Sequence, residues 1–340
     1  MKDLGVAIIG TGWVAGEHIR AYRANPRTEI RAIVSRDRDR AHAKAEEFGL
    51  QNCRGYDHLE EMLAAPGINI VSICTPHHLH VEQGVACAKA GKHLLLEKPV
   101  ALNLEGLRQL QAAVRKAGVR TLVSFVLRWN PLFQTLRALL DDGVVGSLFY
   151  GEVDYLHQVG PWYAQYAWNI QKGIGGSSLL TGGCHAVDGL RWFMKKRAVE
   201  VFAYANTSPR NPLHYEYEPN SVTLVKFEDG AMGKVASSIE CVMPYVFNIE
   251  LLGDMGTIRN NQVFSKRWVG QRGWATIPTV LPDSGDVAHH PFREEVDHFV
   301  DCILNDQESH ANLEDAAQTH EICFASEISA HEKRPVTLPL

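Results

Sequence analysis

The sequence predicts an α/β protein with two domains: an N-terminal Rossmann domain with a doubly wound parallel sheet, and a C-terminal α+β domain with an open, largely antiparallel sheet. Three observations lead to this prediction. The first ~125 residues alternate apolar strand patterns with helix patterns. A glycine-rich turn at Gly10–Ala15 follows the first strand. After about Gly146, strand patterns follow one another through turn signals such as Glu228-Asp229-Gly230, which suit antiparallel hairpins.

Composition and charge exclude several classes of protein. The 340 residues are enough for about two domains. A net charge of −5 gives no attraction to nucleic acid or to an anionic membrane, and no apolar stretch approaches the ~20 residues of a bilayer span. The seven cysteines contain no CxxC pair and are typical of reduced thiols. We therefore expect a cytoplasmic protein that binds neither nucleic acid nor membrane.

The N-terminal domain consists of short apolar strands that alternate with helix patterns. We expect strands at 6–9, 30–34, 70–74, 93–97 and 121–125, and helices at 14–25, 38–48 and 104–117, with another helix ending at Gly91. Asp57 and Glu60 have the spacing of a capping box before a further short helix.

The pattern changes in the C-terminal domain. Asn130 and Pro131 predict a helix start, with Asn130 as the cap and Pro131 in the first turn. We expect strands at 148–158, 199–207, 222–227, 231–239 and 246–252, and helices at 179–194, 292–305 and 313–330. We therefore expect a mixed sheet with helices on one side in the second domain. The Rossmann domain is placed at 1–125 and this second domain at 126–340.

The glycine-rich turn has the features of a dinucleotide site. Gly10 permits a tight turn, Gly12 lets the backbone approach a pyrophosphate, and Ala15 allows close packing of the helix. A plain strand–helix turn would also explain the motif alone, but further strand–helix units follow it. We therefore predict that Gly10, Gly12, Trp13 and Val14 bind a nicotinamide cofactor.

The end of the second strand bears on the choice between NAD and NADP. An acid there would bind the ribose 2′-hydroxyl of NAD, whereas a nearby arginine would accommodate the 2′-phosphate of NADP. Ser35 stands where the acid would be, and Arg36 follows it. This favours NADP over NAD, although Asp37 could still reach the ribose and keeps NAD open.

A lysine ends the buried strand at 93–97. Pro99 has no N–H and stops the strand directly after Lys98. Ligands of an open parallel sheet bind beyond the carboxyl ends of its strands, so Lys98 is expected at the reactive end of the cofactor. The structural alternative is a strand-end lysine whose stem covers apolar surface and whose amine pairs with Glu97.

Several segments together resemble the Gfo/Idh/MocA family of oxidoreductases, which act mainly on sugars and polyols. These segments are Ala90–His93 leading into Glu97-Lys98-Pro99, Cys74–His80, Arg128–Pro131, Gly175-Gly176 with Gly183, His185 and Asp188, and Arg334–Val336. The resemblance spans the whole chain. It implies a Rossmann domain and a second α/β domain that binds substrate and joins subunits into a homo-dimer or homo-tetramer through the large sheet.

The resemblance also implies that Lys98 and His185 face the substrate. Lys98 would donate a hydrogen bond to the substrate hydroxyl, and His185 would act as general base, since imidazole titrates near neutral pH. A buried His185 satisfied by Asp188 is the structural alternative. Many members carry an aspartate four residues before the histidine, but this chain has Thr181, which cannot hold a proton in transit. The full set of proton-transfer groups therefore stays open.

Other candidate residues follow from position and residue type. Aromatic faces pack on sugar rings, and an aromatic cluster precedes Lys172, although packing of a loop over the core would explain it equally well. This cluster comprises Trp162, Tyr163, Tyr166 and Trp168. The predicted substrate-binding residues are Lys98, Arg128, Tyr163, Lys172, Thr181 and His185.

Three close histidines raise the question of a metal site. His77, His78 and His80 have no carboxylate or thiol at matching spacing, and hydride transfer needs no metal, so we expect no metal site. Because this histidine segment follows the end of a strand, we instead expect part of it to contact the cofactor. The remaining predicted cofactor-binding residues are Ser35, Arg36, Thr75, Pro76, His77, His80, Glu97 and Lys98.

These observations predict an NAD(P)-dependent oxidoreductase that transfers a hydride between nicotinamide and a hydroxyl-bearing carbon of a sugar, polyol or sugar derivative. Two alternatives stay open. One is a glycosidase that uses the nicotinamide for transient oxidation and elimination, and the other is a non-catalytic, cofactor-binding sensor. The presence of both Lys98 and His185 argues against the sensor.

Overall fold

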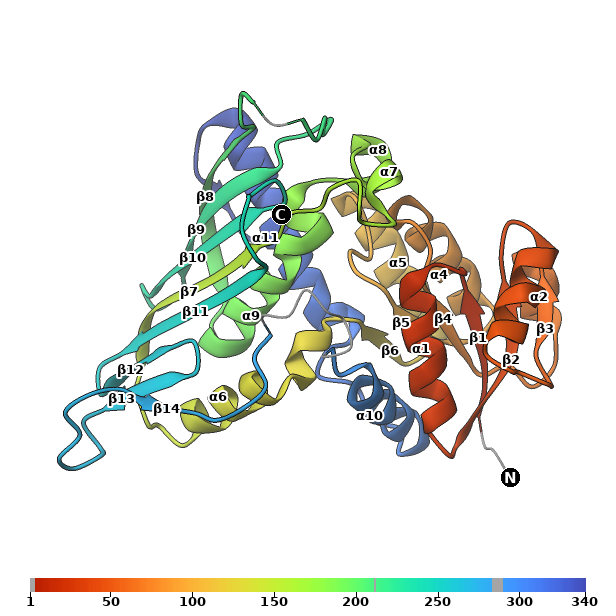
Figure 1. The fold of residues 1–340 in the computed structure, drawn as a ribbon, viewed down its shortest axis with the longest axis horizontal. Coiled ribbons are helices and arrows are strands. Elements are labelled where there is room, and N and C mark those ends of the chain that lie inside the picture. The colour runs from red at the N-terminus through yellow and green to blue at the C-terminus, as the bar shows by residue number, and fades with distance from the viewer. Residues whose placement is uncertain (1–3, 211, 283–289) are drawn as a thin grey trace. The chain divides into compact units, whose positions relative to one another are not determined.

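The computed structural model describes residues 4–210, 212–282 and 290–340. The chain forms two compact units: unit 1 comprises Met1–Ser124 and Pro291–Ala317, and unit 2 comprises Phe125–His290 and Gln318–Leu340 (Figure 1). The sequence pattern predicts a single boundary at 125/126, so the membership of 291–317 in unit 1 is a correction. Helix α10 (Phe292–Leu304) packs on α1 (Trp13–Ala24), and the amide of Val123 donates to the carbonyl of Ala311 at 2.8 Å.

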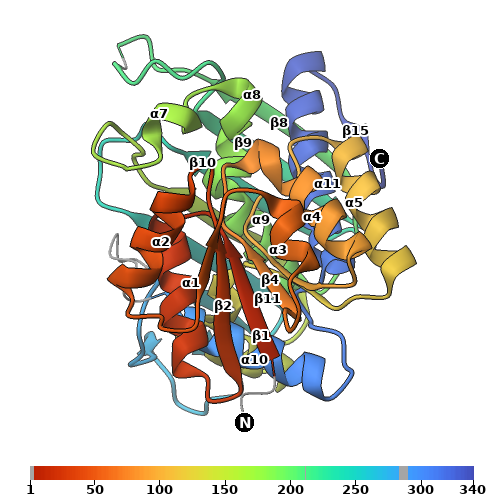
Figure 2. The ribbon, with the colours of Figure 1, turned by 90° about the vertical axis from the view of Figure 1, so that its right-hand side faces the viewer.

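Unit 1 is built on a parallel sheet, which confirms the predicted Rossmann class. Among the described residues it has six strands in the order β3-β2-β1-β4-β5-β6, all labelled in Figure 1, and Figure 2 shows β1 beside β2. The order reverses between β1 and β4, and such a switch point is where ligands bind in this type of sheet. The strands are β1 (Leu4–Ile9), β2 (Thr28–Val34), β3 (Arg54–Tyr56), β4 (Ile70–Ile73), β5 (His93–Leu96) and β6 (Thr121–Val123).

The helices of unit 1 follow the predicted alternation closely. Among them, α1 packs with α10, and α4 (His80–Lys89) packs with α5 (Leu104–Ala117). The predicted capping box at Asp57 is wrong: His58 is the cap residue of α3, and the Asp57 carboxylate instead binds the guanidinium of Arg38 at 2.6 Å. The remaining helices are α2 (Arg38–Glu47), α3 (Leu59–Ala64), η1 (His77–Leu79), α4 (His80–Lys89) and α5 (Leu104–Ala117).

Unit 2 contains a larger mixed sheet. In the described part of the chain its order is β14-β13-β12-β11-β7-β10-β9-β8-β15, and β7 and β10 pair in parallel while the other neighbours are antiparallel. The strands are β7 (Leu148–Leu156), β8 (Ala198–Asn206), β9 (Asn220–Phe227), β10 (Met232–Ser238), β11 (Val246–Gly253), β12 (Gly256–Arg259), β13 (Gln262–Ser265), β14 (Ala275–Thr276) and β15 (Val336–Thr337).

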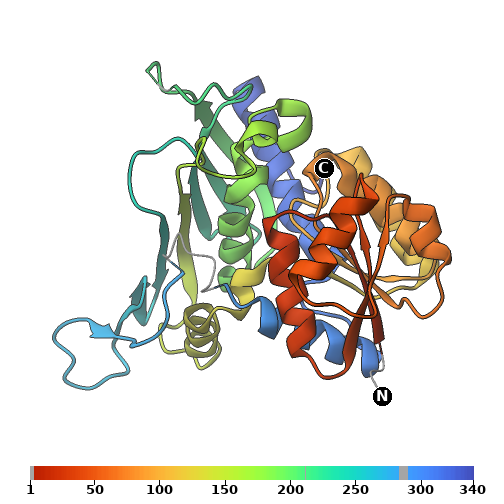
Figure 3. The same cartoon turned by 45° about the vertical axis from the view of Figure 1, so that its right-hand side comes forward.

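Helices cover one face of this sheet. Helix α9 (Cys184–Met194) and the C-terminal part of α11 (Leu313–Glu332) lie along it, green and blue in Figures 1 and 3. As predicted, the Asn130 side chain caps α6 (Pro131–Asp141), accepting from the Leu132 amide at 2.9 Å. The predicted helix 179–194 starts with a π-helical turn, η3 (Leu179–Gly183). The other short helices are η2 (Val126–Trp129), α7 (Tyr166–Asn169) and α8 (Lys172–Gly175).

A helix that crosses a bilayer has to be both long and predominantly apolar. Among the described residues, no helix combines these two properties.

Candidate functional site

The glycine turn after β1 has the geometry of a pyrophosphate site. Gly10 has φ +110°, and a Cβ atom there would lie 2.5 Å from the carbonyl oxygen of Cys74, so only glycine fits. At Gly12, which precedes α1, an added Cβ would meet nothing within 4 Å and would fill the space over the helix start. No acidic residue lies in the first turn of α1. The turn therefore fits the phosphates of a dinucleotide.

At the end of β2, Arg36 and Asp37 are exposed and Ser35 is half-buried. Arg36 is exposed, whereas the Arg38 guanidinium is bound to Asp57 and, at 3.0 Å, to Glu61. The Asp37 side chain caps α2, accepting from the Asp39 amide at 2.9 Å. One oxygen of the exposed Asp37 carboxylate is thus engaged by the helix start, and the side chain still keeps NAD open.

The segment after β4 is braced by a buried histidine. The His80 ring is fully buried, with Nδ1 2.7 Å from the Pro99 carbonyl oxygen and Nε2 2.8 Å from the Thr75 carbonyl oxygen. The Thr75 hydroxyl donates to Gln83 at 2.7 Å. His77 is buried as well, and Pro76 is half-buried.

Glu97 and Lys98 stand at the end of β5, in a polar setting that sequence reasoning missed. The Glu97 carboxylate is buried and lies 3.0 Å from His18 Nε2, while its other oxygen accepts from the Lys98 amide at 3.3 Å. His18 Nδ1 lies 2.6 Å from Ser72 Oγ. The Lys98 side chain is half-buried. The missed signal was a polar His18 among the apolar residues on the inward face of α1.

Charge interactions overcome the cost of burial in this pair. Burial alone lowers the pKa of His18, but interactions with Cys74 and Glu97 raise it well above the ordinary value. Burial alone would raise the pKa of Glu97, but the hydrogen bond and the charge of His18 bring it below the ordinary value. The contact between His18 and Glu97 therefore favours the charged form of each partner.

In unit 2, His185 occupies the first turn of α9, directly after the π-helical turn. Its ring stacks on Tyr155, with centroids 6.5 Å apart and planes 24° apart, and meets the edge of Phe125 at 6.0 Å. A Cβ at Gly182 would lie 2.3 Å from the Tyr155 ring, so the close approach of η3 to Tyr155 requires glycine there. An aromatic surface thus holds the imidazole.

Thr181 has an internal partner. Its hydroxyl donates to Asn169 Oδ1 at 2.7 Å and contacts the Gly175 carbonyl at 3.3 Å. The Tyr217 hydroxyl donates to the Asn169 carbonyl at 2.8 Å. Thr181 therefore joins η3 to α7, and no carboxylate stands at this position.

Additional aromatic residues that the sequence did not single out pack around Tyr155, the ring on which His185 stacks. The Tyr155 hydroxyl lies 3.2 Å from His157 Nδ1, and Tyr245 packs against both rings, at 5.6 and 5.0 Å. Burial lowers the pKa of His157. Tyr155 lies on β7 and His157 follows directly after the strand, two positions further along, and this spacing of two in a polar–aromatic stretch was the available signal.

Only part of the predicted aromatic cluster packs with the aromatic residues around Tyr155. Trp162 packs on His157 at 5.7 Å and on Tyr163 at 5.8 Å. Tyr166 instead donates to the Leu213 carbonyl at 2.6 Å. Lys172 is exposed at the start of α8.

Arg128 requires a correction, because its guanidinium is not available to a substrate. It is 3% exposed and bonded to both carboxylate oxygens of Asp188, at 2.7 and 2.5 Å. The guanidinium also lies over the Trp192 ring at 4.9 Å, and Asp188 accepts from Thr319 at 3.0 Å. This buried pair joins η2 to α9. The alternative from the sequence was that Asp188 satisfies His185. In the structure the Asp188 carboxylate is instead engaged with Arg128.

The structure brings the predicted residues together in two groups. Unit 1 gathers the glycine turn and the ends of β2, β4 and β5, whereas Tyr163, Thr181 and His185 belong to unit 2. Lys98 and His185 therefore lie in different units, and the contacts given above for each residue are contacts within its own unit.

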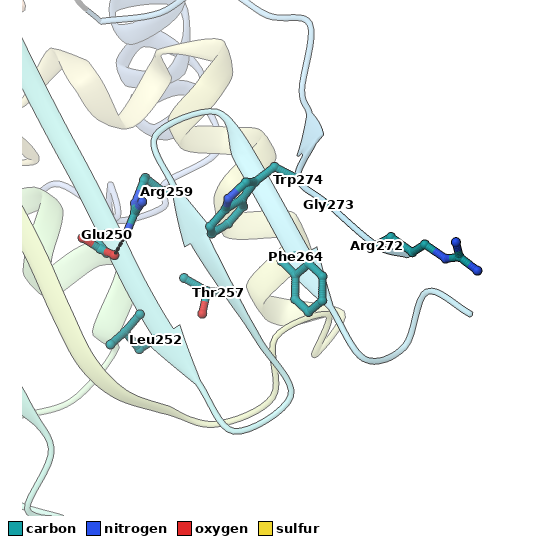
Figure 4. Close-up of a pocket in the computed structure, with 8 residues that line it drawn as sticks. All are labelled: Glu250, Leu252, Thr257, Arg259, Phe264, Arg272, Gly273 and Trp274. Carbon is teal, nitrogen blue, oxygen red and sulfur yellow. Dashed lines mark hydrogen bonds and ion pairs between the residues drawn. The ribbon is translucent and has the colours of Figure 1, made fainter. Parts of the chain in front are cut away.

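A cavity of about 500 Å³ lies at the β11–β14 end of the unit 2 sheet (Figure 4). Arg259 is bound to Glu250 at 2.7 Å and lies 5.5 Å from the Trp274 ring, while Arg272 points away from the other labelled side chains. None of the predicted site residues lines it. The lining comprises Glu250, Leu252, Thr257, Arg259, Phe264, Arg272, Gly273 and Trp274.

A Rossmann unit with a dinucleotide turn, followed by a unit with an open mixed sheet, defines a class of nicotinamide-dependent oxidoreductases. Residues 4–125 match the model of an oxidoreductase family with an NAD-binding Rossmann fold, and residues 133–259 match the GFO/IDH/MocA C-terminal domain. Together these matches cover more than half of the chain. The protein belongs to the GFO/IDH/MocA family of oxidoreductases, which confirms the resemblance seen in the sequence.

Individual relatives are distant. The chain is 36% identical over 194 residues to the uncharacterized oxidoreductase sll0816 of Synechocystis sp., a match that spans 56% of this chain and about half (51%) of that relative. It is 24% identical to myo-inositol 2-dehydrogenase of Thermotoga maritima over 98% of both chains. The fold matches a levoglucosan dehydrogenase solved in complex with NADH, with a TM-score of 0.88, 24% identity and 99% coverage of both chains.

Gly182→Ala tests the packing around His185. We expect the added methyl group to displace the Tyr155 ring, since a Cβ at this position would overlap it, and kcat to fall while the affinity for cofactor is retained. Steady-state kinetics and cofactor titration measure the two effects. Gly173→Ala is the control, because a Cβ at Gly173 meets nothing within 4 Å. Equal kinetics for both variants would show that the contact with Tyr155 has no bearing on turnover.

Proposed function

We propose that this oxidoreductase transfers a hydride between a nicotinamide cofactor and a hydroxyl-bearing carbon of a sugar, polyol or sugar derivative. The single observation that carries the proposal is the place of Lys98. It follows β5 at the carboxyl edge of the unit 1 sheet, the same edge as the Gly10 turn after β1. An amine at this edge is suited to a substrate oxygen next to the reactive carbon.

The chain's own groups supply proton transfer and orientation. The cofactor, when bound, accepts or gives the hydride. Lys98 donates a hydrogen bond to the substrate oxygen. His185 takes the hydroxyl proton as general base, and the stacked Tyr155 ring fixes the plane of its imidazole. Thr181 takes no proton, because its hydroxyl is held by Asn169.

The surroundings of His185 support a carbohydrate-like substrate. Tyr155, Tyr163, Trp162 and Tyr245 present aromatic faces together with polar tips, and Trp162 is 63% exposed. Such surfaces pack on the apolar faces of sugar rings while hydroxyl groups set orientation. The names of the inositol and levoglucosan dehydrogenases among the relatives support the same class.

The function is tested with a panel of sugars, inositols, anhydrosugars and aryl glycosides, each with NAD⁺, NADP⁺, NADH and NADPH. We expect a substrate-dependent change of absorbance at the nicotinamide band with at least one polyol or sugar. Release of the aryl group without net change of cofactor would identify the glycosidase instead. Cofactor binding without either reaction across the panel would favour the sensor.

We further propose that NADP is the preferred cofactor. The support is an exposed Arg36, a Ser35 in place of the acid, and an Asp37 carboxylate engaged at the start of α2. We expect Arg36→Ala to raise the KM for NADPH by roughly 10- to 100-fold, the worth of a charge-assisted bond to phosphate, and to leave the KM for NADH nearly unchanged. Kinetics with both cofactors measure this, with NADH as the internal control. An equal effect on both would remove Arg36 from the 2′-phosphate.

A homo-dimer or homo-tetramer in the cytoplasm completes the proposal. The uncovered face of the unit 2 sheet exposes Tyr204, Val222, Leu224 and Met232, with Leu224 53% exposed. An apolar patch of this kind supports subunit association. We expect light scattering to give a mass of at least twice 37.9 kDa and Leu224→Lys to lower it. A monomeric wild-type protein would contradict the proposal.

A further inference from the structure

The strand end that carries Lys98 is held from two sides by buried histidines of unit 1. On one side, His18 of α1 binds the Glu97 carboxylate at 3.0 Å, and the other oxygen of that carboxylate accepts from the Lys98 amide. On the other side, His80 of α4 contacts the Pro99 carbonyl at 2.7 Å. Both rings are 0% exposed, so neither can touch a substrate directly.

Each histidine is itself anchored. His18 Nδ1 lies 2.6 Å from Ser72 Oγ in the middle of the sheet, and the His18 ring packs on Phe292 of α10 at 5.4 Å. His80 Nε2 reaches the Thr75 carbonyl at 2.8 Å. The two rings therefore tie the Lys98 segment to α1, β4 and α4, and not only to its own strand.

A second buried acid does not compete with Glu97 for His18. Glu295 of α10 is fully buried and accepts from the Ser124 hydroxyl at 3.0 Å. Burial raises the pKa of Glu295 to about 8, although the charge of His18 acts to lower it. The carboxylate hydrogen-bonded to His18 is that of Glu97, which also holds the Lys98 amide.

We propose that His18 is a positioning residue for Lys98, acting through the Glu97 carboxylate, with His80 bracing the following carbonyl. Loss of the imidazole leaves Glu97 as a buried carboxylate without its main partner, and the carboxylate must then move or take a proton. Either change releases the Lys98 amide and lets the amine drift from the substrate oxygen. Small displacements of this kind cost turnover because the reacting groups must be held at close range.

This inference rests on the proposed role of Lys98, so its first test does not depend on activity. Hydrogen–deuterium exchange of the ligand-free protein is measured for the peptide that spans 96–101. We expect His18→Asn to speed exchange in this peptide. His298→Asn is the matched control, because His298 also lies near a serine hydroxyl, Ser309 at 3.0 Å, in the same unit. Unchanged exchange at 96–101 in His18→Asn would overturn the proposal.

The second test is a double-mutant cycle on turnover. We expect His18→Asn to lower kcat by roughly 10- to 100-fold with cofactor affinity retained. In the Lys98→Met background, His18→Asn should lower kcat no further, because it acts through the lysine. Equal losses in both backgrounds would mean a general structural role and overturn the proposal. If His18→Asn does not fold, Ser72→Ala, which removes the hydroxyl that anchors the imidazole and also contacts Cys74, enters the same cycle with a smaller expected loss.

The two tests separate the two claims. If Lys98→Met alone leaves turnover intact, the proposed function fails whatever His18 does. If Lys98→Met is inactive but hydrogen–deuterium exchange at 96–101 is unchanged in His18→Asn, the positioning proposal alone fails.

Discussion

Lys98→Met should lower kcat by about 10²- to 10³-fold, the usual loss when one donor to a reacting oxygen is removed. Methionine keeps the length and apolar stem of the side chain, so the half-buried site stays filled. The affinity for NADPH should change little, because the phosphates are assigned to the Gly10 turn and not to Lys98. Stopped-flow hydride transfer and a binding titration measure the two quantities.

Lys92→Met is the matched control for this experiment. Lys92 precedes the same strand at its other end, where its amine donates to the Ile68 carbonyl at 2.9 Å. We expect turnover within about twofold of the wild type. A Lys98→Met enzyme with near wild-type turnover on its substrate would remove Lys98 from the reaction.

Arg128→Met should destabilise unit 2 by about 3–5 kcal/mol, because it leaves the Asp188 carboxylate buried without its main partner. The side chains of both residues are almost completely inaccessible, at 2% and 3%, so solvent screens the pair very little. Denaturant unfolding followed by tryptophan fluorescence reports on this unit, since Trp13 lies in unit 1 and the other six tryptophans lie in unit 2.

Two further variants are compared with Arg128→Met: one breaks an exposed ion pair, and the other removes both partners of the buried pair. Arg197→Ala breaks the exposed pair with Glu228, at 3.1 Å, and should cost at most ~1 kcal/mol. Arg128→Met combined with Asp188→Leu should recover much of the loss, because no buried charge is left. If Arg128→Met is no more harmful than Arg197→Ala, the pair does not hold η2 and α9 together.

The strand and helix pattern of unit 1 was predictable because most of its parallel strands are buried on both faces and give a continuous apolar run. Leu94–Leu96 is such a run, and the structure has β5 there. The strands β3, β12, β13 and β14 were not predicted, because two to four residues are too few to establish a period of two. Their pairing with longer neighbours, and not their own pattern, makes them strands.

Motif residues were more predictable than their partners. Gly10, Lys98 and His185 come from local patterns and from the family resemblance, whereas the contacts of His18 with Glu97 and of Arg128 with Asp188 join residues 79 and 60 positions apart. No spacing rule reveals such pairs. Arg128 was therefore assigned to substrate although it is buried, and His18 was overlooked although it contacts the central motif.

The return of residues 291–317 to the first unit has a consequence for recombining this protein with its relatives. Exchanging only residues 1–125 would place a foreign α1 against the native α10, and the contacts of Asn25 with Asp297 at 2.7 Å and of His18 with Phe292 would then join chains of different ancestry. A working hybrid has to inherit both segments from one parent, so the unit that binds the dinucleotide is transferred in two pieces.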